Sequence, residues 1–220
     1  MGTITGTVIA DRARILLQDT VVGGTRWKDP ELLLWVNDAQ REIVGLKPNV
    51  LTVTVDVTLV AGSKQTLPVG GTQLIDVVRN VNGMAIRRAD KHIMDGENVG
   101  WHEDTASQVV RNFVFNEDAP DVFYVYPQQP TSGMSAVELQ YVREPVNLST
   151  LASTIDLKDL YLNAILDYIL YRAYMKDAAE GSVTRAGAHY TAMANSLGVK
   201  VQNELSLTPN ANAEGSRYRG

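Results

Sequence analysis

Apolar side chains recur every three to four residues in two segments near the start of the chain, which is the spacing of an amphipathic helix. The first segment runs from Thr7 to about Asp19. The second starts at Pro30, behind the capping carboxylate of Asp29, and ends at Lys47 because a residue that precedes a proline disfavours the helical conformation. A glycine-rich turn joins the two segments, so the pattern predicts a helical hairpin.

The period changes to two after Asn49, where valines alternate with polar residues from Thr52 to Leu59. This alternation predicts a strand. Short apolar runs separated by Gly, Pro, Asn and Asp turns predict further strands at 65–68, 74–81, 112–115, 122–126 and 136–142. Together these segments indicate a compact antiparallel β module.

Residues 157–179 are apolar almost all round, which is typical of the central helix of a bundle. Lys158 and Asp167 interrupt this stretch, whereas a membrane span needs about 20 nearly uninterrupted apolar residues. Gly181 ends the helix, and Ser182 is expected to cap a last one. The last helix has a stripe at Ala186, Tyr190, Met193, Leu197 and Val201. Beyond it the chain has no core-forming pattern and is expected to be mobile.

These elements predict an α+β fold, in which the N- and C-terminal helix pairs form a four-helix bundle with an inserted antiparallel β module and a flexible C-terminal tail. The expected division is residues 1–49 for the N-terminal helical hairpin, 50–150 for the β-rich module, 151–206 for the C-terminal helical pair and 207–220 for the tail.

Composition narrows the range of functions. The 220 residues include no cysteine, which excludes disulfides, thiol catalysis and thiolate zinc sites. The formal net charge of -5 argues against a protein whose main task is to grip a phosphate backbone. The first residues lack the basic and then apolar pattern of a secretory signal, so Met1 is expected to be the mature start.

A search for catalytic or ligand-binding patterns predicts no catalytic residue, no metal site and no cofactor. The three histidines, His92, His102 and His189, do not have the spacing of a metal site on one helix face. The densest polar cluster is His102, Glu103 and Asp104, and no nucleophile motif accompanies it.

The best basic cluster is Arg87, Arg88 and Lys91. Asp90 and Asp95 are interleaved with it and weaken its field, so a solvated face is favoured over a nucleic-acid contact.

One segment carries a recognisable pattern. Residues 26–44 read R-W-x-D-P-E-L-L-x-W-V-N-D-A-Q-R-E-I-V, and this pattern resembles the opening of the head-to-tail adaptor proteins of tailed bacteriophages, also called connector or gatekeeper proteins. The match covers two helices and their loop, and the rest of the chain is similar to the family only in architecture.

The resemblance implies a structural virion protein that forms a ring of about twelve copies under the portal, joins the DNA-filled capsid to the tail and surrounds the DNA channel. The implied partners are the portal protein, the tail tube or nozzle protein, further copies of the chain and DNA passing transiently, with no membrane. The implied location is the neck of the virion, after assembly in the host cytoplasm. Another neck or tail ring, such as a stopper or tail terminator, remains an alternative. Two further alternatives are a virion-associated hydrolase using Glu103 and Asp104, and a generic binding module.

The resemblance also suggests two sets of contact residues. Portal binding is assigned to the end of the chain, because Tyr and Arg are enriched at interface hot spots. That set is Leu205, Leu207, Arg217, Tyr218 and Arg219. The expected subunit interface is Arg26, Trp27, Trp35, Asp38, Arg41 and Glu42.

Overall fold

The computed structural model describes residues 2–22, 24–177 and 182–207, and for 199–207 it describes the backbone alone. The chain divides into two compact units. The helical unit is formed by the residues up to Val50 and from Pro145 onward, and the β unit by Leu51–Glu144. The predicted α+β class is confirmed. The four-helix bundle and the four-part division of the chain stay predictions.

The first two helices are α1 (Gly6–Leu16) and α2 (Asp29–Leu46). Helix α1 ends earlier than expected because Gln18 adopts a left-handed backbone conformation with φ 57°. The prediction that Asp29 caps α2 is wrong. Lys28 occupies the N-cap without a side-chain hydrogen bond, and the Asp29 carboxylate accepts a hydrogen bond from the guanidinium of Arg14 instead.

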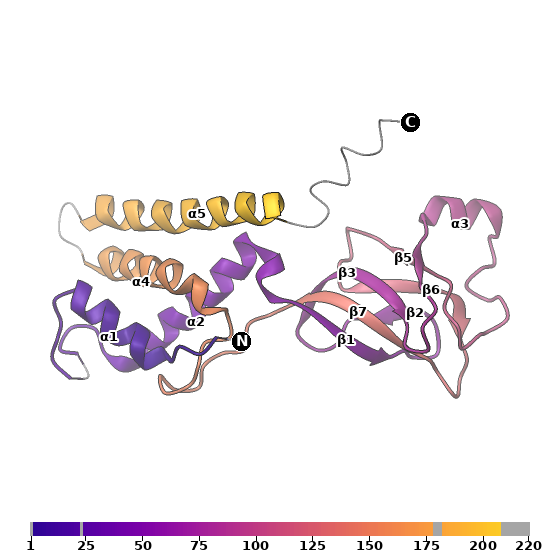
Figure 1. The fold of residues 1–220 in the computed structure, drawn as a ribbon, viewed down its shortest axis with the longest axis horizontal. Coiled ribbons are helices and arrows are strands. Elements are labelled where there is room, and N and C mark those ends of the chain that lie inside the picture. Colours follow the sequence, from indigo (N-terminus) through magenta and orange to yellow (C-terminus); the bar gives the residue numbers. More distant parts are fainter. Residues whose placement is uncertain (1, 23, 178–181, 208–220) are drawn as a thin grey trace. The chain divides into compact units, whose positions relative to one another are not determined.

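Helix α4 (Leu162–Lys176) contacts α1, α2 and α5 (Ser182–Leu207), and Figure 1 shows α4 running beside α5. More than half of its residues are buried, as expected for a helix that is apolar almost all round. It begins later than predicted because Asp159–Tyr161 forms a 3-10 turn first. The buried face of α5 includes the predicted Ala186, Met193 and Leu197, while the side chain of Val201 lies outside the described residues.

The β unit contains two sheets, with strand orders β1-β7-β3 and β2-β6-β5-β4. The strands are β1 (Thr52–Thr58), β2 (Gly62–Thr66), β3 (Gly71–Asn80), β4 (Arg87–Arg88), β5 (Asn112–Phe115), β6 (Val122–Gln129) and β7 (Ala136–Arg143). A 3-10 turn, Pro48–Leu51, precedes β1. The expectation of a wholly antiparallel module is wrong at one place, since β4 and β5 pair in parallel. Strand β5 can run parallel to β4 because a long connection, which carries helix α3 (Lys91–Glu97), joins the two strands.

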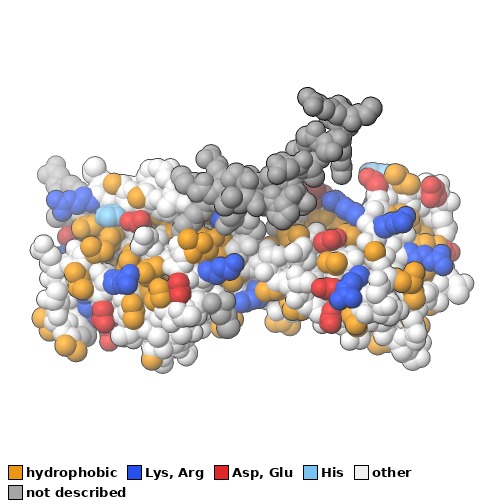
Figure 2. Space-filling view, in the orientation of Figure 1, with side chains coloured by type: hydrophobic (Ala, Val, Ile, Leu, Met, Phe, Trp, Pro, Cys, Tyr) orange, Lys and Arg blue, Asp and Glu red, His pale blue; other side chains and the backbone are white. Residues whose placement is uncertain are grey.

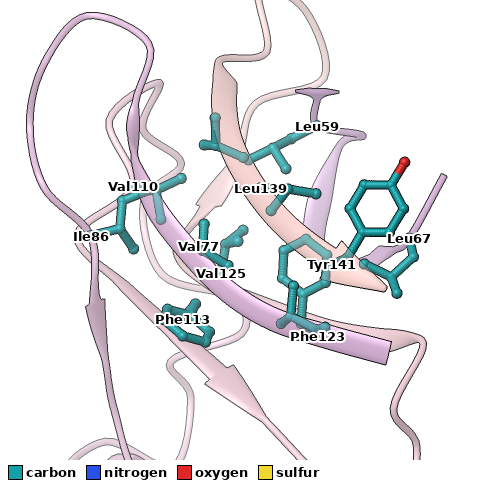
Figure 3. Close-up of a cluster of buried hydrophobic side chains, with 12 residues drawn as sticks. Leu59, Leu67, Val77, Ile86, Val110, Phe113, Phe123, Val125, Leu139 and Tyr141 are labelled. Atoms are coloured by element: carbon teal, nitrogen blue, oxygen red, sulfur yellow. The ribbon is translucent and has the colours of Figure 1, made fainter. Parts of the chain in front are cut away.

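The core of the β unit lies between the two sheets. Strands β6 and β7 alternate between buried and half-buried residues, so one face of each is directed inward. Figure 3 shows Phe123 of β6 and Leu139 and Tyr141 of β7 meeting Val77 of β3 in this core. The strands predicted at 122–126 and 136–142 lie within β6 and β7.

The sheet edges differ in regularity. Strand β3 is an edge strand with three register shifts against β7, so its buried residues recur every third position, at Leu74, Val77 and Asn80. The outer side of β3 is occupied by hydrogen bonds: the Leu74 N–H donates to Pro120 O (2.9 Å) and the Val77 N–H to the Asp76 carboxylate (2.9 Å). Strand β1, the opposite edge of the same sheet, pairs with β7 in one unbroken register.

Candidate protein–protein interface

The loop between α1 and α2 is organised by one buried carboxylate. Asp19 accepts hydrogen bonds from the Thr25 hydroxyl (2.6 Å), from the Thr25 N–H (2.9 Å), and from the N–H groups of Arg26 (3.0 Å) and Trp27 (2.9 Å). The Thr25 hydroxyl and these three backbone groups hold the pKa of the Asp19 carboxyl well below its usual range. The charged form of Asp19 therefore fixes the course of the loop.

The return of the loop requires a glycine. Gly24 has φ 69°, and a Cβ atom at this position would lie 2.3 Å from the carbonyl oxygen of Trp27. The side chain of Lys28 donates back to the Gly24 carbonyl at 2.7 Å. The hydrogen bonds of Asp19 and Lys28 therefore fix residues 24–28, which lead into α2.

The two tryptophans of the 26–44 pattern lie inside the helical unit. Trp27 is 3% exposed and Trp35 is 7% exposed, and their ring centroids are 5.6 Å apart. The guanidinium of Arg26 lies 5.1 Å and the ammonium of Lys176 5.4 Å from the Trp27 ring centroid. Both indoles are therefore buried below the surface of the helical unit. The polar residues of the expected subunit interface are the members that reach the surface.

Those polar members already contact other parts of the helical unit. Arg26 forms an ion pair with Asp177 (2.9 Å). Arg41 pairs with Asp38 (3.0 Å) and donates to the Asn147 side chain (2.7 Å). Exposed pairs of this kind contribute little to stability, so these charges remain free to exchange partners in a complex.

Glu42 has a different role from the exposed charges. Its carboxylate accepts a hydrogen bond from the Tyr190 hydroxyl at 2.8 Å, which ties α2 to α5. This hydrogen bond, followed by burial, raises the pKa of Tyr190. Glu42 thus acts within the helical unit.

Two amides of the same helix have buried roles that the sequence did not predict. Asn37 exchanges two hydrogen bonds with the backbone of Leu148 (3.1 and 2.8 Å), and Gln40 accepts one from the Asp156 N–H (2.8 Å). Both amides are buried, and they hold the segment that returns from the β unit. The available signal was the presence of two amide side chains among the buried apolar positions of α2.

The tip of the α1–α2 loop exposes apolar side chains. Val22 is 100% exposed and Val21 is 57% exposed, and Ile15 of α1 beside them is 65% exposed. A pocket of about 500 Å³ adjoins the tip and is lined by these three residues together with Asp11, Asp29 and Leu151 among others. An exposed apolar group of this kind is typical of a surface that binds another protein.

The portal-binding residues predicted from the sequence are only partly within the described structure. The backbone of α5 extends to Leu207 and includes Leu205, but the side chains of both lie outside the described residues. Arg217, Tyr218 and Arg219 also lie outside them.

The polar cluster that could have served an enzyme is engaged in packing and hydrogen bonds. The His102 ring stacks on the buried Trp101 with centroids 3.6 Å apart, and its Nδ1 lies 2.8 Å from the Ser63 hydroxyl. Asp104 accepts hydrogen bonds from Asn98 (2.7 Å) and from the Tyr126 hydroxyl. Glu103 is exposed in solvent. Within the described residues, no group of acidic and histidine side chains could hold a metal ion.

The basic cluster is similarly neutralised. Lys91 pairs with Asp95 at 2.5 Å, and Arg88 approaches Glu117 at 3.9 Å. On the face drawn in Figure 2, cationic and acidic side chains are interspersed over the molecule. In the described part of the chain, no helix has the length and apolar character required to cross a bilayer.

The exposed apolar tip of the α1–α2 loop is the feature of this site that best fits a contact with another protein. The sequence profile of the SU10 adaptor protein family matches residues 4–214, so the chain belongs to this family. It is a phage structural adaptor and a component of the virion, with other phage structural proteins as its partners. No curated protein gives a significant match to the chain.

Proposed function

We propose that this chain is the head-to-tail adaptor of a tailed phage, which assembles as a ring of about twelve copies under the portal and joins the DNA-filled capsid to the tail. Membership of the adaptor family over residues 4–214 is the observation that carries the proposal. The portal, the tail tube or nozzle protein and further copies of the chain are the partners, and the ring surrounds the channel for DNA in the neck.

The α1–α2 loop supports a role in assembly. A closed ring uses two different surfaces of each subunit, and one of them has to present a feature that the neighbour receives. The Val21–Val22 tip follows Asp19, whose hydrogen bonds hold residues 25–27, and its exposed apolar side chains are available for burial in a contact. In this proposal the tip contacts a neighbouring subunit or the portal, and Arg26, Asp38 and Arg41 surround the contact.

The distribution of charge fits passage of DNA without retention. Residues 51–144 contain seven Lys and Arg against twelve Asp and Glu, whereas the rest of the chain carries thirteen of each. The whole net negative charge therefore belongs to the β unit. An acidic surface repels phosphate, so a channel bordered by this unit would let DNA slide.

The end of the chain is proposed to anchor the ring on the portal. Arg217, Tyr218 and Arg219 would fold onto the portal surface on binding. A variant that ends at Leu207 is expected to lose binding to purified portal rings. A control variant with residues 208–216 replaced by Gly and Ser, and the last four retained, is expected to keep it.

Electron microscopy of phage particles tests the main proposal. Particles produced while this gene is silenced should be heads without tails, and supply of the gene in trans should restore complete particles. Normal tailed particles in the silenced culture would refute the neck assignment. Three-dimensional reconstruction of the ring on the portal would then measure the copy number.

A further inference from the structure

The outer edge of strand β1 is a well-defined structural feature to which the proposed function assigns no role. Leu59 N–H donates to Ser135 O at 3.0 Å, which continues the β1–β7 register by one residue. In an antiparallel ladder the bonding direction alternates along the strand. The backbone N–H and C=O groups of Val53, Val55 and Val57 therefore bond to β7, and those of the residues between them point away from β7. That outward set is Thr52, Thr54, Asp56 and Thr58.

The neighbouring ladder supports this assignment. Val81 N–H donates to Ala136 O at 3.0 Å, so the even-numbered residues of β7 point toward β3 and the odd-numbered ones toward β1. Among the described residues, none forms a hydrogen bond with the outward N–H or C=O groups of Thr54, Asp56 or Thr58. The edge thus presents a row of unpaired backbone groups.

The other sheet edges are protected against pairing, which makes β1 distinct among the described strands. Strand β3 is bulged, and its Leu74 and Val77 N–H groups donate to Pro120 O and to the Asp76 carboxylate. Strand β2 has a register shift and carries Lys64, and β4 is two residues long. Bulges, edge lysines and short strands are the usual devices that prevent unwanted strand addition. Strand β1 has no bulge and no lysine, is seven residues long, and carries one charged residue, Asp56, among β-favouring Thr and Val.

The side chains along β1 specify what an added strand must carry. Asp56 lies opposite Glu138 of β7 on the outer face of the sheet, and Glu138 bonds to Arg79 of β3. A residue placed opposite Asp56 from the open side is therefore favoured if it is Lys or Arg. Val55 is on the inner face and 39% exposed, so the flanking residues of the added strand are favoured if they are apolar.

We infer that β1 is a docking edge for an extended segment of another virion protein, with the local pattern apolar, basic, apolar, which adds as a further strand to the β1-β7-β3 sheet. Main-chain hydrogen bonds to Thr54, Asp56 and Thr58 supply affinity, and Asp56 with Val55 supplies selectivity. The inference rests on the proposed function only in taking the partner to be a virion protein.

Two capped synthetic peptides test this edge on the full chain. One reads Ser-Val-Thr-Val-Lys-Val-Thr-Val-Ser, and the other has Glu in place of Lys. The Lys peptide should bind about fivefold or more tightly than the Glu peptide, and Asp56→Lys should reverse this preference. Glu117→Lys changes the net charge equally on an exposed loop and should leave the preference unchanged.

A second variant removes an edge donor without breaking the existing ladder. Thr54→Pro lacks an outward N–H, and proline is tolerated at such edge positions, so this variant should fold and lose both peptides. Hydrogen exchange resolves the site directly: the amides of Thr54, Asp56 and Thr58 should exchange fast in the free chain and become protected with the Lys peptide. The amides of Val53, Val55 and Val57 should be protected throughout, which also verifies folding of the variants.

Several results would overturn the inference. Absence of binding by either peptide at millimolar concentration, or binding that neither Thr54→Pro nor Asp56→Lys alters, would exclude the edge as a docking site. Binding only after removal of residues 208–220 would identify the chain's own end as the occupant. Self-association of the wild type that Thr54→Pro abolishes would identify a second copy. Peptide binding does not depend on a ring or a portal, so failure here leaves the particle microscopy to judge the proposed function separately.

Discussion

Replacement of Asn37 by Leu tests whether the buried amides of α2 hold the helical unit together. The leucine side chain has a similar volume but no hydrogen-bonding atoms, so the N–H and the C=O of Leu148 both lose their partner. Leu148 is 5% exposed, and water has little access to replace the bonds. Each buried backbone group left unpaired costs about 1–3 kcal/mol, so the free energy of unfolding should fall by about 2–5 kcal/mol.

The neighbouring residue provides a matched control. Asp38→Asn alters the exposed pair with Arg41 on the same turn of α2, and such pairs contribute about 0–1 kcal/mol. Urea unfolding followed by tryptophan fluorescence can be confined to the helical unit, because Trp27 and Trp35 lie there and Trp101 lies in the β unit. The measurement is best made with Trp101→Phe in the background of every variant.

The reasoning would be refuted if Asn37→Leu and Asp38→Asn had the same unfolding midpoint. It would also be refuted if Asn37→Leu lowered stability only in the β unit, as seen by hydrogen exchange of its strands. A double variant of Asn37 and Gln40 would then show whether the two amides are coupled, because both bind the same returning segment.

Three further changes probe separate features. Ile169→Ala empties a fully buried site on α4 and should lower the free energy of unfolding by about 2–5 kcal/mol in urea titration; a loss below 1 kcal/mol would mean that the site collapses. The pKa of Asp19 is lower in the folded protein than its unfolded value of about 3.9, so its charged form stabilises the fold above that pH and this stability is lost as the pH falls toward the folded pKa. In Asp19→Asn the melting temperature should therefore fall less steeply with decreasing pH in the acidic range. Val22→Asp should leave thermal stability unchanged yet weaken ring or portal assembly in sedimentation assays. Val69→Asp, equally exposed in the β unit, should leave assembly unaffected, and equal assembly of both variants would remove the loop tip from the interface.

The elements with a clear period were the ones that sequence predicted well. The helix predicted over 157–179 contains α4, which contacts three other helices, and the strands predicted at 122–126 and 136–142 lie within β6 and β7. Strand β3 covers most of the strand predicted at 74–81, but its register shifts give a burial period of three in place of the period of two of a regular strand.

The parts that sequence could not supply depend on contacts between distant backbone groups. Asn37 and Gln40 bind main-chain atoms of Leu148 and Asp156, more than one hundred positions away, and a backbone carbonyl leaves no residue-specific signal. The role of Asp19 was also invisible, because its partners are mainly N–H groups of a loop. Trp27 and Trp35 are buried against each other, and Lys176 of α4 lies over the Trp27 ring, so the sequence pattern alone did not separate buried residues from contact residues.

The path of the chain through the two units has a consequence for synthesis on the ribosome. Thr5 bridges to Thr154, Gly6 N–H donates to Ser153 O, and α1 and α2 pack on α4, so the first fifty residues must await partners that are made only after the β unit. The β unit, by contrast, is contiguous from Leu51 to Glu144 and has its own core. We therefore expect the β unit to fold first. Until the C-terminal helices are made, the apolar face of the N-terminal hairpin is exposed in the growing chain and can bind chaperones.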